Sequence, residues 1–96
     1  MMNVINLGTV SATGTTTAIN VADRNRFATP VNSGVVQVTG NASYDISLEG
    51  SCDNSNWVTI ASGVKGGQAR SVVMMPWMRA NCTTTATGSS TIYITF

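Results

Sequence analysis

Apolar and polar side chains alternate along much of the chain, in short runs separated by glycine, proline and asparagine. The clearest run is Tyr44–Cys52, in which one phase is mainly apolar and the other is polar. The apolar phase contains Tyr44, Ile46, Leu48, Gly50 and Cys52, and the polar phase contains Asp45, Ser47, Glu49 and Ser51. Successive strand residues point to opposite faces, so the run predicts a strand with one buried and one solvated side.

The same pattern predicts eight strands and no helix of useful length. They are Val4–Val10, Thr15–Val21, Val35–Thr39, Tyr44–Cys52, Trp57–Ala61, Ser71–Met75, Trp77–Thr84 and Ser90–Phe96. Short alternating strands with turn signals every eight to twelve residues are typical of a sandwich or barrel. We therefore predict an all-β chain of about seven or eight strands. It forms a single antiparallel β-sandwich over residues 1–96, with immunoglobulin-like or jelly-roll connections.

The phase of the alternation also predicts the core. On the last strand Ile92, Ile94 and Phe96 share one face, and Val36 and Val38 lie on the face opposite Val35 and Gln37. Trp57 directly follows the polar turn Asp53–Asn56, and we expect it to anchor the core between two sheets. For Trp77, beside Pro76 and three methionines, a core position and a contact surface are equally good interpretations. Pro76 cannot donate to a strand ladder and should mark a strand end, an edge or a bulge.

Two segments are the best candidates for partner contacts. Residues 1–12 form an extended N-terminal segment with no evident pairing partner nearby, and residues 22–34 form a long connection with two of the five cations. Long loops in small domains frequently carry binding. The predicted contact residues are Asn3, Val4, Ile5, Leu7, Arg24, Arg26 and Phe27.

Charge is scarce. Charged residues make up 9% of the 96 residues, and the net charge is +1, whereas soluble domains typically carry about 25%. Few charges protect poorly against self-association. Either hydroxyls and amides solvate the surface, or the protein works inside an assembly, and we favour the assembly. Its scattered cations argue against nucleic acid as a partner. Its short apolar runs exclude a membrane-spanning helix, and Met1–Leu7 does not resemble a secretory signal.

Cys52 and Cys82 are the only cysteines, and both fall on the apolar phase of their strands. They are interpreted as two small buried thiols, which a reducing cytosol would preserve. The alternative is a disulfide that closes a loop of about thirty residues and contributes roughly 3–4 kcal/mol. With no histidine and only two cysteines, a structural zinc site is not expected.

The residue inventory argues against catalysis. No histidine is available for acid–base chemistry near neutral pH, and Asp45 and Glu49 should lie about 13 Å apart on a solvated strand face. No helix follows Gly66-Gly67 to form a phosphate-binding loop. Asp53–Asn56 lacks the glycine and the terminal bidentate acid of a calcium loop. We predict no enzyme activity, no metal site and no cofactor.

Two segments together carry a family resemblance. They are Leu48–Ile60, containing Gly50-Ser51-Cys52-Asp53-Asn54-Ser55-Asn56-Trp57, and Met75–Asn81. They resemble small β-sandwich virion proteins of tailed bacteriophages, which commonly carry a Gly-Ser-x-Asp-Gly-x-x-Trp turn, a Pro-x-x-Arg strand and a final alternating strand. The resemblance covers residues 35–96. This chain differs at Asn54, where glycine is usual, so its turn is expected to be less tight.

The resemblance implies a structural role in the virion. Such modules serve as capsid decoration (cement) proteins, head fibres, or tail and baseplate appendages. The leading hypothesis is a decoration protein that binds the major capsid protein, is assembled in the host cytoplasm, and forms homo-oligomers, with a trimer as the first expectation. The alternative is a tail, fibre or baseplate module that binds host-surface glycans through an exposed tryptophan.

Overall fold

A computed structural model describes residues 3–24, with only the backbone of Arg24, and residues 32–96. It contains one short 3-10 helix, η1 (Ala22–Arg24), and nine strands. The strands are β1 (Val4–Val10), β2 (Gly14–Thr15), β3 (Ile19–Asn20), β4 (Ser33–Val38), β5 (Asp45–Ser51), β6 (Val58–Lys65), β7 (Gln68–Val73), β8 (Trp77–Thr84) and β9 (Ser90–Thr95). The bounds of β1 and β8 are those that the alternation predicts.

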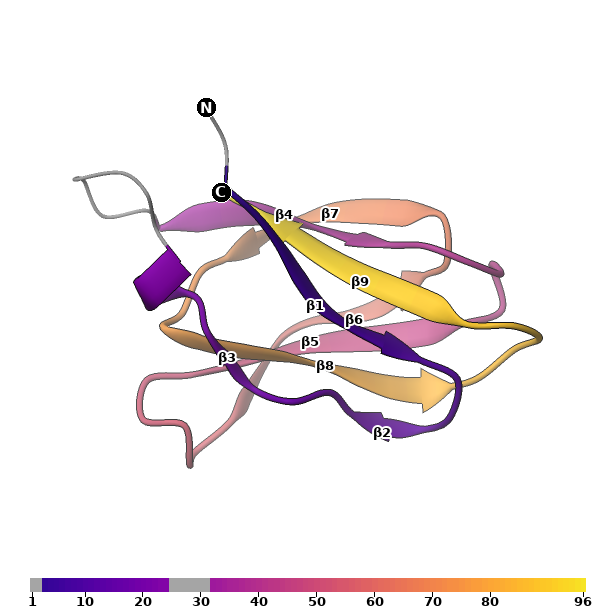
Figure 1. Ribbon diagram of the computed structural model, residues 1–96, viewed down its shortest axis with the longest axis horizontal. Coiled ribbons are helices and arrows are strands. Elements are labelled where there is room, and N and C mark those ends of the chain that lie inside the picture. Colours follow the sequence, from indigo (N-terminus) through magenta and orange to yellow (C-terminus); the bar gives the residue numbers. More distant parts are fainter. Residues whose placement is uncertain (1–2, 25–31) are drawn as a thin grey trace.

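The strands form two antiparallel sheets packed face to face as a β-sandwich (Figure 1). The four-stranded sheet has the order β1-β9-β4-β7, and the five-stranded sheet has the order β2-β8-β5-β6 with β3 also paired to β8. The β1–β2, β4–β5, β6–β7 and β8–β9 connections all cross between the sheets at one end of the molecule. With β2 and β3 counted as one interrupted strand, this eight-strand order is a jelly roll. The jelly-roll prediction is confirmed, and the immunoglobulin-like alternative is excluded.

Thr16 explains how β2 and β3 act as one strand across the break between them. Its backbone N–H donates to the carbonyl of Ala80 at 2.8 Å, and its Oγ1 accepts the N–H of Ala80 at 3.0 Å. A threonine hydroxyl therefore takes the place of a backbone carbonyl in the ladder with β8. This edge of the five-stranded sheet stays continuous although its strands are only two residues long.

The core lies between the sheets and consists of the inward phase of each strand. Val36, Val38, Ile92 and Ile94 are fully buried from the four-stranded sheet, as predicted. The five-stranded sheet contributes Tyr44 just before β5, followed by Ile46, Leu48, Val64, Met78, Ala80 and Cys82. The hydroxyl of Tyr44 donates to the carbonyl of Gly88 at 2.5 Å. This bond satisfies the buried tyrosine and ties the β8–β9 connection to the start of β5.

The N-terminal segment is extended, as expected, but it has a partner. β1 pairs with β9 along its whole length, and Asn3 exchanges two backbone hydrogen bonds with Phe96 at 2.7 and 3.1 Å. Ile5 and Leu7 are only 5% and 2% exposed, because they belong to the core. The partner strand lies at the opposite end of the chain, so no local pattern reveals it.

Asn54 keeps the turn between β5 and β6 tight without glycine. Its φ is +60°, which makes it the only non-glycine residue with positive φ in the part of the chain that the structure describes. Asparagine adopts this left-handed conformation more readily than other non-glycine residues, because its side chain is short and polar. The expected loosening of the turn at this position is therefore not observed.

Candidate interaction surfaces

The outer face of the four-stranded sheet carries no charged side chain, and all four of its strands are described in full. Its residues are Val4, Asn6, Thr9, Ser33, Val35, Gln37, Ala69, Ser71, Val73, Thr91, Tyr93 and Thr95. We call this surface the neutral face. Val4 and Val73 are two of the most exposed large apolar side chains in the described chain, at 66% and 64%. They lie on the two edge strands, β1 and β7.

The outer face of the five-stranded sheet has the opposite character. Lys65 Nζ lies 2.9 Å from Asp45 Oδ2, and Arg79 Nε lies 2.7 Å from Glu49 Oε1. Asn81 also donates to Glu49, over 3.3 Å. Of the described strand residues, these four charged ones share a face, while Arg70 lies at an edge. The four paired charges thus lie on the outer face of the five-stranded sheet, and Arg70 lies on β7, at the edge of the four-stranded sheet.

Trp57 also lies on this charged side, so its prediction as a core anchor is wrong. The guanidinium of Arg79 covers its ring, with the carbon Cζ 4.1 Å from the ring centroid. Trp57 is half-buried and is absent from the core cluster. The polar turn returns the chain on the outer side of β5, where Glu49 fixes the arginine above the indole. Trp77 is likewise half-buried, next to the fully buried Met78, and therefore points to the same outer side.

Asp53 organises the turn that precedes Trp57. Its Oδ1 accepts the backbone N–H groups of Ser55 and Asn56 at 2.9 and 2.8 Å and the hydroxyl of Ser51 at 2.8 Å. Its Oδ2 accepts the side-chain amide of Asn56 at 2.7 Å. Bonds from Asn56 first, then from Ser55 and Ser51, stabilise the carboxylate and hold the pKa of Asp53 well below its usual range. Asp53 therefore has a structural role, because its carboxylate holds the turn together through these hydrogen bonds.

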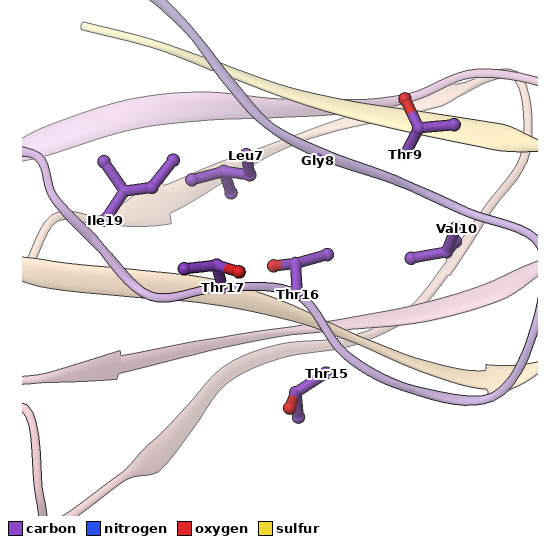
Figure 2. Close-up of a pocket in the computed structure, with 8 residues that line it drawn as sticks. All are labelled: Leu7, Gly8, Thr9, Val10, Thr15, Thr16, Thr17 and Ile19. Atoms are coloured by element: carbon purple, nitrogen blue, oxygen red, sulfur yellow. The ribbon is translucent and has the colours of Figure 1, made fainter.

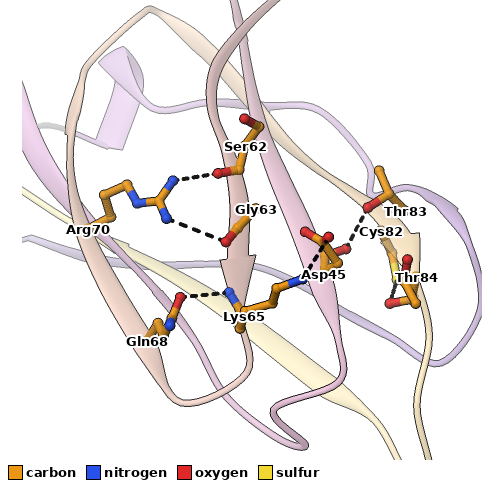
Figure 3. Close-up of polar contacts among 9 residues, drawn as sticks. All are labelled: Asp45, Ser62, Gly63, Lys65, Gln68, Arg70, Cys82, Thr83 and Thr84. Atoms are coloured by element: carbon orange, nitrogen blue, oxygen red, sulfur yellow. Dashed lines mark hydrogen bonds and ion pairs between the residues drawn. The ribbon is translucent and has the colours of Figure 1, made fainter.

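Arg70 lies at the side of the sandwich where β6, the edge strand of the five-stranded sheet, and β7, the edge strand of the four-stranded sheet, lie next to each other (Figure 3). Its guanidinium donates to the carbonyls of Ser62 and Gly63 on β6, and the backbone N–H of Lys65 donates to the side chain of Gln68. The unpaired backbone of an edge strand is a template for aggregation, and charged side chains protect against it. One edge of the sandwich is therefore closed by an arginine.

The opposite edge holds a shallow open groove of about 430 Å³ between β1 and the β2–β3 strand (Figure 2). Its lining is apolar and hydroxyl-bearing: Leu7, Gly8, Thr9, Val10, Thr15, Thr16, Thr17 and Ile19. Gly8 has a φ of +144°, and a Cβ built on it would lie 3.0 Å from Cγ2 of Thr16. Glycine thus lets the two edges approach. None of the lining residues titrates, so the groove offers no acid, base or ionic nucleophile.

Both cysteines are free thiols, and they differ in burial. Cys82 is buried, and its burial raises the pKa of its thiol. Cys52 is exposed, which contradicts the prediction that both are buried. β5 ends at Ser51, where the bond between Ser51 and Asp53 turns the chain, so the alternation stops one residue earlier than expected. The disulfide alternative is excluded in this structure.

The structure separates the predicted contact residues. Val4 lies on the neutral face, whereas Ile5 and Leu7 are core residues and Asn3 is buried beside Phe96. This is a correction, because buried side chains cannot meet a partner. Arg24 ends η1, and Arg26 and Phe27 lie outside the described residues.

The predicted contact residues lie in segments 1–12 and 22–34, so only Val4 of the neutral face is among them. The signal for this face was present in the sequence, since no outward position of residues 33–38 or 90–95 is charged. What the sequence did not reveal is that these two strands are neighbours and that β1 and β7 flank them.

Among the described residues, no three of His, Cys, Asp and Glu cluster closely enough to hold a metal ion, and no helix is long and apolar enough to cross a membrane. The chain matches no family model, and no curated protein or solved structure is detectably similar to it.

Proposed function

We propose that this protein is a bacteriophage virion structural protein, most specifically a capsid decoration protein that binds and stabilises the major capsid lattice. The resemblance of residues 35–96 to such modules supports this role. Jelly rolls serve both as viral capsid domains and as lectin domains, so the fold is compatible with the proposal but does not choose between these functions.

The observation that carries the proposal is the neutral face. A protein that stays alone in solution is protected from association by charges spread over its surface. Here the four-stranded sheet presents an outer face without charge, with Val4 and Val73 exposed at its edges. Such a surface suits a protein whose face is covered in an assembly.

The proposed mechanism is mechanical and involves no reaction. Decoration across the boundary between capsid subunits opposes their separation, provided that each contact buries about 1,000 Å² or more. Val4 is retained as a proposed contact residue within the assembly, because it alone of the four predicted N-terminal contacts is exposed. The proposed location is the outer capsid surface, after assembly in the host cytoplasm.

The proposal is tested by separating capsids from tails of particles that carry this protein and measuring its copy number in each by mass spectrometry. We expect many copies on capsids and none on tails. We also expect that capsids stripped of the protein lose their contents at a lower temperature and recover when it is added back. Finding the protein on tails alone would contradict the decoration role.

A second candidate, a tail or fibre module that binds glycans, is favoured by one observation. Trp57 and Trp77 are half-exposed on the same outer side as Glu49 and Asn81, which are hydrogen-bonding groups suited to sugar hydroxyls. Because Arg79 covers one side of the Trp57 ring, only part of it is free to stack on a sugar. Titration with glycans while following tryptophan fluorescence distinguishes this role, since the decoration role predicts no change.

A further inference from the structure

We propose that the neutral face packs against the neutral face of a second copy of this chain, as a twofold-symmetric pair. The inference goes beyond the decoration role, because it names what covers this face, and it is testable without any capsid. It begins from the absence of charged side chains on this face. A charged group placed against the neutral face would lose its hydration and meet only hydroxyl, amide and aliphatic groups. The occupant must therefore be uncharged, and the same face of a second copy meets this condition.

The neutral face can pair with itself about a twofold axis. A twofold axis along the strand direction, between β9 and β4, reverses the order β1-β9-β4-β7 in the second copy. β1 of one copy then lies over β7 of the other, and β9 lies over β4. Twofold contacts of this kind use one patch twice and close on themselves. Sheets packed in this way lie about 10 Å apart with their strands within about 30° of each other.

The residues nearest the axis match chemically. Gln37 on β4 and Tyr93 on β9 are cross-strand neighbours in the middle of the face. The twofold operation places Tyr93 of each copy over Gln37 of the other, so a phenol hydroxyl meets a side-chain amide twice. Thr95 on β9 and Val35 on β4 are also cross-strand neighbours within one copy. The twofold operation therefore places Thr95 of each copy over Val35 of the other.

The apolar edge residues fit the same arrangement. Val4 on β1 pairs with Thr95 on β9, and Val73 on β7 pairs with Ser33 on β4. Both valines therefore lie toward the same end of the sheet. Because β1 of one copy covers β7 of the other, Val4 of one copy faces the edge strand that contains Val73 of the other copy. The pair would therefore bury the two most exposed valines of the four-stranded sheet, at 66% and 64% exposure.

The size of the face predicts a weak pair. Four strands of six or seven residues, about 4.8 Å apart and at about 3.3 Å per residue, give roughly 400 Å² of sheet plane per copy. Stable interfaces bury about 800 Å² on each partner, and smaller ones are transient. We therefore expect a reversible, concentration-dependent dimer.

Sedimentation equilibrium of the full chain tests the proposal, over roughly 1 μM to 1 mM, the range in which weak association appears. We expect the mean mass to rise from 10.0 kDa toward twice that value. Gln37→Lys places two ammonium groups near the axis and should weaken association at least tenfold, because like charges across an interface are strongly disfavoured. The matched control, Thr59→Lys, adds the same side chain at an exposed strand position opposite Glu49, on the other sheet, and should leave association unchanged.

Three results would overturn the proposal. The first is a mass that stays at that of one chain throughout the range. The second is association that Gln37→Lys leaves intact or that Thr59→Lys weakens equally, since the interface would then lie elsewhere. The third is a trimer, because a twofold contact closes at two copies. These results concern association between copies of this chain, whereas capsid binding is measured on capsids, so the two proposals are tested separately.

Discussion

Arg79 lies over the indole ring of Trp57, 4.1 Å from its centroid, while its Nε donates to Glu49 at 2.7 Å. The arginine is thus held between an aromatic ring and a carboxylate that come from opposite ends of the β5–β6 turn. This cluster accounts for two features of the sequence. It explains why a tryptophan follows the polar turn although it does not enter the core, and why Glu49 and Arg79 are placed thirty residues apart.

Arg79→Lys should reduce the free energy of unfolding by about 1 kcal/mol, because lysine loses the planar stacking on Trp57 and the fixed fork toward Glu49. Urea unfolding followed by tryptophan fluorescence measures this, and the folded-state emission should change as well. The control is Lys65→Met, which removes the more exposed pair with Asp45 and should cost less than about 1 kcal/mol. Equal effects of the two variants would contradict the role assigned to stacking.

Gly66→Ala should destabilise far more than Gly67→Ala, although the two glycines are adjacent. A Cβ on Gly66 would lie 2.0 Å from the carbonyl oxygen of Asn41, and backbone cannot move aside as a side chain can. We expect a loss of about 3 kcal/mol or more for such overpacking. Gly67 has a φ of +85° with open space around it, so its variant should cost only about 1–2 kcal/mol of backbone strain. Thermal unfolding of both variants checks the order, and the reverse order would contradict the packing described at this turn.

Asp53→Asn should destabilise the protein at neutral pH and do so less as the pH falls. The folded-state pKa of Asp53 is lowered, because Asn56, Ser55 and Ser51 donate to its carboxylate. The ionised carboxylate therefore stabilises the fold fully at a pH above the pKa of the unfolded chain, which is about 4. This stabilisation is lost progressively as the pH falls toward the lower pKa of the folded protein. Urea unfolding of both proteins between neutral and acidic pH should show the difference shrinking below about pH 4. A difference that is constant with pH would show that the charge of Asp53 does not matter.

Cys52 should react with a thiol reagent in the folded protein, whereas Cys82 should react only after unfolding. The first thiol is exposed in a turn, and the second is buried, with its pKa raised by that burial. Reactivity depends on access and on the thiolate form. Mass spectrometry of peptides after brief alkylation distinguishes the two sites. Protection of Cys52, or formation of a disulfide between Cys52 and Cys82 of one chain under mild oxidation without unfolding, would contradict the structure around β5.

Local patterns predicted more of the fold than of its surfaces. Alternation predicted the bounds of β1 and β8 and the inward phase of Val36, Val38, Ile92 and Ile94, because burial on one face of a strand imposes a two-residue period. The pairing of β1 with β9 is a contact between the two ends of the chain, and nothing local specifies it.

The errors at Cys52 and Trp57 both lie at the polar turn between β5 and β6. β5 ends at Ser51, where Ser51 and Asp53 hydrogen-bond to each other, so Cys52 belongs to the turn and not to the strand. Trp57 was expected in the core because it directly follows the turn, but it lies outside, beneath Arg79. The neutral face lies beyond sequence reasoning for another reason. It appears only when β1, β9, β4 and β7 are placed side by side, which the order of residues along the chain does not reveal.

Titration of purified protein into capsids that lack it tests the decoration role most directly. Capsids are sedimented at rising protein concentration, and the bound copies are counted by quantitative mass spectrometry. The account predicts saturation at a fixed number of copies per capsid that does not increase with further protein. Absence of co-sedimentation, or binding that rises without a plateau, would contradict it.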